Sequence, residues 1–248
     1  MAIRHHRRTT ADELVLVDSL RAAPSGLQTE QFDDGSTSYL DDVIPKPWGN
    51  EFRVYADDLY DVWKLCLRPG QSTSVHCHPR KETALLCLSG QGRIQLIDDE
   101  NSISGGDIGI IGKGVFHGTT NAGPDDLHLV EVEVPRNKFD LVRLHDRYGR
   151  RGEQYETARA NASSALQPGM LVTRSKLRHG VTLDGFQFGV RAGLDLATRP
   201  VPNLLFAVSL SVGDALDHQI TVLPAAAVAR TVDHEQLYLY ISRSNSEE

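Results

Sequence analysis

The residues best suited to chemistry are three histidines and a glutamate, which lie in two segments of the chain. The first segment runs from His76 through Cys77 and His78 to Glu82, and the second ends at His117. If the first segment is a β-strand, His76 and His78 project from one face and Cys77 from the other, because successive side chains alternate. We expect Glu82 to open the next strand and His117 to come from a later one.

Three imidazoles and one carboxylate suit a single divalent ion. Nitrogen and oxygen donors in this mixture bind Fe(II), Mn(II), Ni(II), Zn(II) or Co(II) and exclude a soft thiolate site. The alternative is a surface or hydrogen-bonded core position for each histidine, since short motif matches carry a risk of false positives. The spacing predicts one divalent transition metal ion, Fe, Mn, Zn, Ni or Co, at His76, His78, Glu82 and His117.

Composition and charge exclude several classes of protein. The 248 residues suit one large domain or a domain with a smaller companion. A formal net charge of −7 argues against a nucleic-acid partner, which favours a basic surface. The apolar run Leu14–Val17 is too short for a signal peptide or a membrane span. The three cysteines include no CxxC pair, which fits a reducing compartment, so we expect a cytoplasmic protein without a membrane partner.

Short apolar runs at even spacing predict β-structure from about residue 44 to residue 134. Glycine- and proline-rich turns separate these runs, a pattern typical of a β-sandwich or barrel. The expected strands are Phe52–Tyr55, Asp61–Leu67, Ser74–His78, Thr83–Leu88, Arg93–Ile97, Asp107–Ile111 and Leu127–Val134.

A leader of residues 1–42 precedes this β-structure. Residues 1–8 are basic and are interpreted as a solvated tail. Thr10 and Glu13 have the spacing of a capping box, so a short helix is expected to follow and to run through Leu20. We expect the leader to pack on or beside the β-domain.

The remaining chain divides into a β-domain over residues 43–150, a linker over 151–162 and a C-terminal β-rich unit over 163–248. The C-terminal unit has no matching metal motif, so it is interpreted as structural or dimerising, or as a degenerate copy of the first domain. The strands expected in it are Met170–Thr173, Phe186–Val190, Leu204–Val212, Gln219–Leu223 and Gln236–Ile241.

Two segments resemble the paired motifs of the cupin superfamily, the second with a glycine at position 112 where proline is usual. The motifs read Gly70-x5-His76-x-His78-x3-Glu82 and Gly106-x5-Gly112-x-Gly114-x2-His117-x3-Asn121. The resemblance implies an all-β double-stranded β-helix, or jelly roll, with a metal ion inside the barrel.

The flanks of these motifs resemble sugar-phosphate isomerases of the phosphomannose isomerase type. The matching segments are Lys46-Pro-Trp-Gly49 and residues 140–150, so the resemblance covers about residues 43–150. It implies an aldose–ketose isomerase. The chain departs from the family pattern in the spacing to Glu82, which is one residue shorter, and at His145, where an acid is common.

An isomerase of this type needs a base that moves a proton between neighbouring carbons. Glu131 and Glu133 alternate with valines over residues 129–134, so both carboxylates share one strand face. If that face lines the barrel, Glu131 is the first candidate base and Glu133 the second; alternatively, both acids face solvent over a valine core. Lys64 is likewise either an inward catalytic group or an outward charge that protects a strand.

Four basic residues near the motifs form the predicted substrate-binding set. A cluster of cations can bind a phosphate through charge-assisted hydrogen bonds, although each alone is more often a surface charge. The four are Lys46, Arg80, Lys81 and Arg143.

These features support three hypotheses about function. The first is a metal-dependent isomerase that acts on a sugar phosphate or a similar small polar metabolite. The second is an Fe(II)-dependent dioxygenase or other oxygenase, because three histidines and a glutamate also suit that chemistry. The third is a non-catalytic cupin that binds a metal or ligand in a regulatory role. For each we expect a homodimer.

Overall fold

The computed structural model describes residues 1–6, 10–22, 43–137, 140–145, 147 and 180–244. The expected linker and the expected strand Met170–Thr173 lie outside the described residues. The elements are β1 (Ile3–His6), α1 (Ala11–Ala22), β2 (Ile44–Lys46), β3 (Gly49–Ala56), β4 (Asp61–Leu67), β5 (Val75–Cys77), β6 (Glu82–Ser89), β7 (Gln91–Gln95), β8 (Glu100–Ser104), β9 (Ile108–Ile111), β10 (Gly118–Asn121), β11 (Leu127–Val134), β12 (Val142–His145), β13 (Val181–Leu183), β14 (Phe186–Ala192), α2 (Gly193–Thr198), β15 (Leu204–Ser209), α3 (Val212–Leu216), β16 (Val222–Pro224), α4 (Ala225–Thr231) and β17 (Leu237–Arg243).

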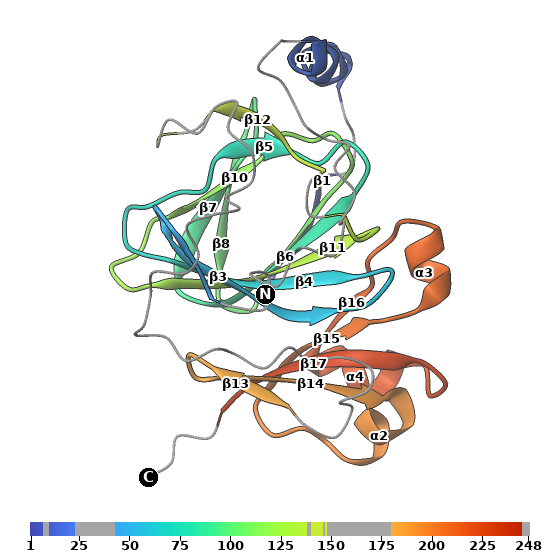
Figure 1. Cartoon of the computed structure of the whole chain (residues 1–248). Helices are drawn as coiled ribbons and strands as arrows, with labels where there is room; N and C mark the ends of the chain where they lie inside the picture. Colours follow the sequence, from blue (N-terminus) through green and yellow to red (C-terminus); the bar gives the residue numbers. More distant parts are fainter. Residues whose placement is uncertain (7–9, 23–42, 138–139, 146, 148–179, 245–248) are drawn as a thin grey trace.

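Strands β1 to β12 form the jelly roll that the motifs predict. One wall is a seven-stranded sheet in the order β1-β9-β6-β11-β4-β3-β2, and the other consists of the sheets β10-β7-β8 and β12-β5. A backbone bridge between His76 and His117 ties the two smaller sheets together. The walls enclose a core to which both contribute, for example Trp63 and Leu129 from one and Ile94 from the other. The all-β cupin fold is therefore confirmed (Figure 1).

The central strands of the seven-stranded sheet are buried on both faces, and alternation divides their side chains between two cores. On β11, Leu127 and Leu129 pack inside the barrel, whereas Val130 and Val132 belong to a second core outside it. The other two central strands, β4 and β6, divide in the same way. Residues 84–88 of β6 form a continuous apolar run because neither face of that strand is left to water.

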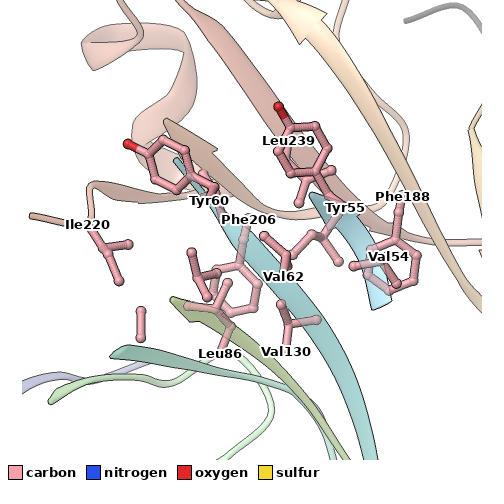
Figure 2. Packing of buried hydrophobic residues seen from close by; sticks show 14 of the residues in the cluster. Val54, Tyr55, Tyr60, Val62, Leu86, Val130, Phe188, Phe206, Ile220 and Leu239 are labelled. Carbon is pink, nitrogen blue, oxygen red and sulfur yellow. The ribbon is translucent and has the colours of Figure 1, made fainter. Parts of the chain in front are cut away.

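The C-terminal unit covers the outer face of this sheet. Its strands form a five-stranded sheet in the order β13-β14-β17-β15-β16. Phe188, Phe206 and Leu239 from this sheet pack against Val62 and Val130 of the barrel wall (Figure 2). The second core is thus an interface between two sheets.

The C-terminal unit is not a second barrel in its described residues. They form one open sheet, and helices α2 and α4 pack on the face that is turned away from the barrel. Leu196 and Val228 from these helices contact a core that includes Tyr238 and Tyr240. The suggestion of a degenerate cupin copy is therefore wrong for the described residues. The domain boundaries themselves stay a prediction.

Polar contacts also hold the unit in place. The hydroxyl of Tyr60 donates to the carbonyl oxygen of Ser211 (2.9 Å), and the guanidinium of Arg243 donates to that of Leu88 (3.2 Å). Both acceptors are backbone groups, so these bonds fix the chain path as well as side-chain positions.

Two parts of the leader, residues 3–6 and 11–22, form regular secondary structure. Residues 3–6 form β1, which pairs in parallel with β9, so the interpretation of this segment as a solvated tail is wrong. Its backbone amides and carbonyls extend the sheet regardless of its basic side chains. The capping box is confirmed: the Glu13 amide donates to Oγ1 of Thr10 (3.1 Å) and the Thr10 amide donates to the Glu13 carboxylate (2.7 Å).

Most expected strands are present with small shifts at their ends, and β4 and β11 have the expected bounds. The run Leu204–Val212 is the main exception, because β15 ends at Ser209 and Val212 begins α3. Ser211 caps that helix, since its side chain accepts from the Asp214 amide. Among the described residues, no helix is long and apolar enough to cross a bilayer.

The packing of the two sheets predicts a large cost for truncating Phe206. Its side chain is fully buried between them, so Phe206→Ala should lower the free energy of unfolding by about 3–5 kcal/mol in urea denaturation. Leu216→Ala, at a side chain that is 69% exposed, should change it by less than about 0.5 kcal/mol. Equal effects for the two variants would contradict the interface.

Candidate metal centre

The three histidines come together at the junction of β5 and β10. His76 lies within β5, His78 directly follows it, and His117 directly precedes β10. His76 and His117 exchange two backbone hydrogen bonds, of 2.9 and 2.7 Å, so their side chains start from opposed positions. The ring centroids of the three imidazoles lie 4.6 to 5.6 Å apart. Cys77 projects away from them into an apolar cluster, as alternation predicts.

Each imidazole is oriented by a hydrogen bond from Nδ1 to a backbone carbonyl. The bonds join His76 to Ser74 (2.8 Å), His78 to Asp140 (2.7 Å) and His117 to Val115 (3.0 Å). A carbonyl oxygen only accepts, so Nδ1 carries the proton and Nε2 presents a lone pair. Such bonds are the usual support for a histidine that ligates a metal.

Burial keeps these rings neutral. Loss of hydration lowers the pKa of His76 and His78 well below the ordinary value of 6.5, with further lowering from His117 and Lys81 respectively. The pKa of His117 is lowered to about 4, again chiefly by burial. Neutral imidazoles are the form that binds a metal.

Glu131 supplies the fourth donor. Ligand atoms of His76, His78, His117 and Glu131 all lie within 4.8 Å of one another. Nε2 of His78 and Nε2 of His117 are buried and have no hydrogen-bond partner among the described residues. Buried polar atoms are rarely left unsatisfied, so this donor set fits a divalent ion.

Glu82, the predicted carboxylate ligand, is not in this group. It occupies the face of β6 that carries Ala84 and Leu86, which belong to the interface core. Its Oε1 accepts a hydrogen bond from the backbone amide of Ile220 (3.0 Å) in the C-terminal unit. A one-residue change of spacing reverses the face of a strand residue, so the short spacing turns Glu82 outward and Thr83 inward.

The sequence left the facing of Glu131 and Glu133 open, and the structure places both inside the barrel. The valines of β11 pack against the C-terminal sheet, outside the barrel, so the glutamates between them face the barrel interior. Both carboxylates therefore line the same pocket as the histidines. Glu131 belongs to the donor group, which differs from its predicted role as the first candidate base.

Glu133 lies against a buried lysine. Lys81 is fully buried, and its Nζ donates to Oε1 of Glu133 (2.6 Å). That oxygen is 3.6 Å from Nε2 of His78, while Oε2 of Glu133 is buried and has no hydrogen-bond partner in the part of the chain that the structure describes. Lys81 was predicted to bind substrate phosphate, but its ammonium is engaged with Glu133.

Lys64, a predicted catalytic residue, lies on the wrong face of β4. Its Nζ contacts Oδ2 of Asp184 and, at 3.1 Å, Nδ1 of His128. Cys66, His128 and Asp184 form a second group with ligand-type atoms within 4.8 Å. Lys64 has the parity of Val62, which faces the interface, whereas Trp63 faces the barrel, so the structure does not bring Lys64 into the pocket.

The remaining predicted cations differ in position. Lys46 and Arg143 line the pocket, and Lys46 is paired with buried Glu51 (3.4 Å). Arg143 lies opposite His76 in the pairing of β12 with β5. The Arg80 guanidinium is half-exposed and bonds Asp140 (3.1 Å), so it does not line the pocket.

Several pocket residues were not predicted individually. Trp48 lies in the turn between β2 and β3, Glu51 lies on β3, and Thr73 and Thr119 add hydroxyls. Trp48 belongs to the Lys46–Gly49 segment that the family resemblance singled out, which was a usable signal. The threonines carry no such signal, because hydroxyl residues are common on strands.

The pattern and the fold together define a cupin. A family model described as the Cupin domain matches residues 63–133, a range that includes His76, His78, His117 and Glu131. The chain therefore carries a cupin domain.

Similar proteins include mannose-1-phosphate guanylyltransferase of Escherichia coli, with 29% identity over 109 residues, or 43% of this chain and 23% of that protein. The xanthan biosynthesis protein XanB of Xanthomonas campestris is 26% identical over 109 residues, with the same coverage of 43% and 23%. The chain thus spans about a quarter of the length of the curated relatives it matches. A solved structure of an uncharacterized conserved protein with a double-stranded beta-helix domain from Klebsiella pneumoniae is 25% identical over 44% of this chain and 96% of its own, with a TM-score of 0.38.

The two glutamates give a direct test of the donor set. Glu131→Gln should weaken Co(II) binding by more than about tenfold, because it replaces an anionic donor with a neutral amide. Glu82→Gln should leave the affinity unchanged, since its side chain contacts Ile220 outside the barrel. Competition with a chromophoric chelator measures both. The opposite result would restore Glu82 as the ligand.

Proposed function

We propose that the chain is a metal-dependent cupin enzyme, an aldose–ketose isomerase that acts on a sugar phosphate or a similar small polar metabolite. The observation that carries this proposal is the convergence of three groups in one pocket. The histidines and Glu131 offer a metal site, Glu133 offers a carboxylate oxygen that no described residue bonds, and Lys46 and Arg143 offer positive charge.

The first of these three groups is the metal site. His76, His78, His117 and Glu131 would hold one divalent transition metal ion, and the donor types do not select among Fe, Mn, Zn, Ni and Co. A bound ion supplies Lewis acidity, which polarises a carbonyl or holds adjacent hydroxyl groups.

Glu133 is suited to move the proton between neighbouring carbons. Lys81 donates to Oε1 and so fixes the carboxylate, which leaves Oε2 for the substrate. A base in this pocket would take a proton from C1 or C2 of a bound sugar and return it to the neighbouring carbon. General bases of this kind contribute about 10²–10⁴-fold to the rate.

Lys46 and Arg143 are suited to an anionic group on the substrate. Arg143 is half-buried beside His76, and its fork of donors matches a phosphate or carboxylate. Two relatives named for mannose-1-phosphate and xanthan chemistry support a phosphorylated sugar, although this chain matches only 23% of each. The expected cytoplasmic location and homodimer stay predictions.

Solvent exchange tests the isomerase. With metal added, deuterium from the solvent should enter C1 or C2 of mannose or fructose phosphates, as followed by NMR. Glu133→Gln should lower this rate by about 10²–10⁴-fold while metal affinity stays unchanged. Glu100→Gln, at an exposed side chain of β8, is the matched control and should exchange at the normal rate.

The same protein samples separate the alternatives. No exchange and no conversion over a panel of sugar phosphates would contradict the isomerase. Oxygen uptake with Fe(II) and a small-molecule substrate would instead indicate the oxygenase. Metal binding without either activity would indicate a regulatory cupin.

A further inference from the structure

The N-terminal segment, residues 1–6 and 10–22, contacts the loop of residues 112–117, which carries His117. It contacts this loop at both ends of the loop. At one end, the amide of Gly112 donates to the carbonyl oxygen of His6 (2.7 Å). At the other, the amide of Phe116 donates to Oε1 of Glu13 (3.2 Å). Phe116 immediately precedes His117, so the second bond holds the backbone next to a metal-site histidine. Gly114 between them has φ +74°, a turn conformation that glycine adopts freely.

Apolar packing reinforces these bonds. Val17 on α1 is buried in a cluster with Cys77, Phe116 and Val142. Each of those three residues is next in sequence to a residue that lines the pocket, and alternation turns it away from the pocket. Helix α1 therefore packs on the outer side of the strands whose inner side carries the histidines. It lies beside β12 and β5 (Figure 1).

Glu13 joins the helix to the loop. One carboxylate oxygen, Oε2, accepts from the amide and hydroxyl of Thr10, and the other accepts from the amide of Phe116. The side chain is 5% exposed, so water does not compete for these bonds. A carboxylate that accepts from backbone amides forms charge-assisted bonds, which are stronger than neutral ones.

We propose that Glu13 is a positioning residue for the metal centre. It forms, with His6 and Val17, an N-terminal clamp that holds the His117 imidazole where Nε2 meets the other donors. The proposal rests on metal binding at the proposed site, and it assigns a purpose to the leader. Groups that orient ligands from outside the donor set usually change metal affinity by about 10–100-fold when they are removed.

The test compares Glu13→Ala, Glu13→Gln and the control Asp12→Asn. Asp12 is exposed in the same first turn, so its substitution removes an equal charge from the helix terminus without touching the loop. The measurements are Co(II) affinity by chelator competition, the visible spectrum of the Co(II) protein, and urea unfolding without metal. All three variants are also made in a His117→Ala background.

We expect Glu13→Ala to weaken Co(II) binding by about 10–100-fold and to alter the Co(II) spectrum. Glu13→Gln keeps an acceptor oxygen for Phe116 and should lose less, while Asp12→Asn should match the wild type. In the His117→Ala background Glu13→Ala should cause no further loss, because residues that act through one another are not additive.

Equal Co(II) affinity in wild type and Glu13→Ala would overturn the clamp, as would an equal loss with and without His117. If Glu13→Ala does not fold, the Glu13→Gln protein decides by the same criteria. A wild-type protein that binds no Co(II) would instead refute the metal centre itself.

Discussion

Alternation of side chains along strands that are buried on both faces is the constraint on which this molecule depends. The central strands of the seven-stranded sheet must supply one core inside the barrel and another against the C-terminal sheet. Every polar residue on them is therefore committed to one side by its parity. Glu131 and Glu133 lie in the pocket, while Lys64 and Glu82 lie in the interface with the C-terminal sheet. The chemistry of the barrel and the attachment of the second unit are set by the same register.

The sequence could predict the features that local rules determine. The jelly roll, the three histidines and the opposite facing of Cys77 follow from motif spacing and alternation. The capping box at Thr10 and Glu13 follows from the residue preferences at the N-terminus of a helix. The facing of Lys64 and the β11 glutamates could not be predicted, because it depends on what covers the outer wall, whereas the short spacing of the first motif was a signal for the outward facing of Glu82. An outer wall exposed to water would accept any charged side chain. Here the C-terminal unit covers the wall and supplies specific partners, Asp184 for Lys64 and the Ile220 amide for Glu82.

The buried charges inside the barrel are paired before any ligand binds. Lys81 faces Glu133 and Lys46 faces Glu51, each over a short distance in a region with little water. Isolated charges at such depth would be costly, whereas paired ones with further hydrogen bonds can be retained. The histidines achieve the same end by neutrality, since burial lowers their pKa values. The pocket is therefore assembled in a form that can accept a cation without prior rearrangement of protons on the imidazoles.

Lys64, at the interface between the two units, affects which of the donor groups in the chain can bind a metal ion. Of the two donor groups in the described residues, the one with Cys66, His128 and Asp184 already surrounds the Lys64 ammonium. An ion that approached this group would meet a like charge and a protonated thiol, because burial raises the pKa of Cys66 to about 11. Thiophilic ions such as zinc or copper are thus discouraged from the only described donor group that contains sulfur. Of the two groups, the nitrogen and oxygen donors in the barrel are therefore the better fit for a divalent ion.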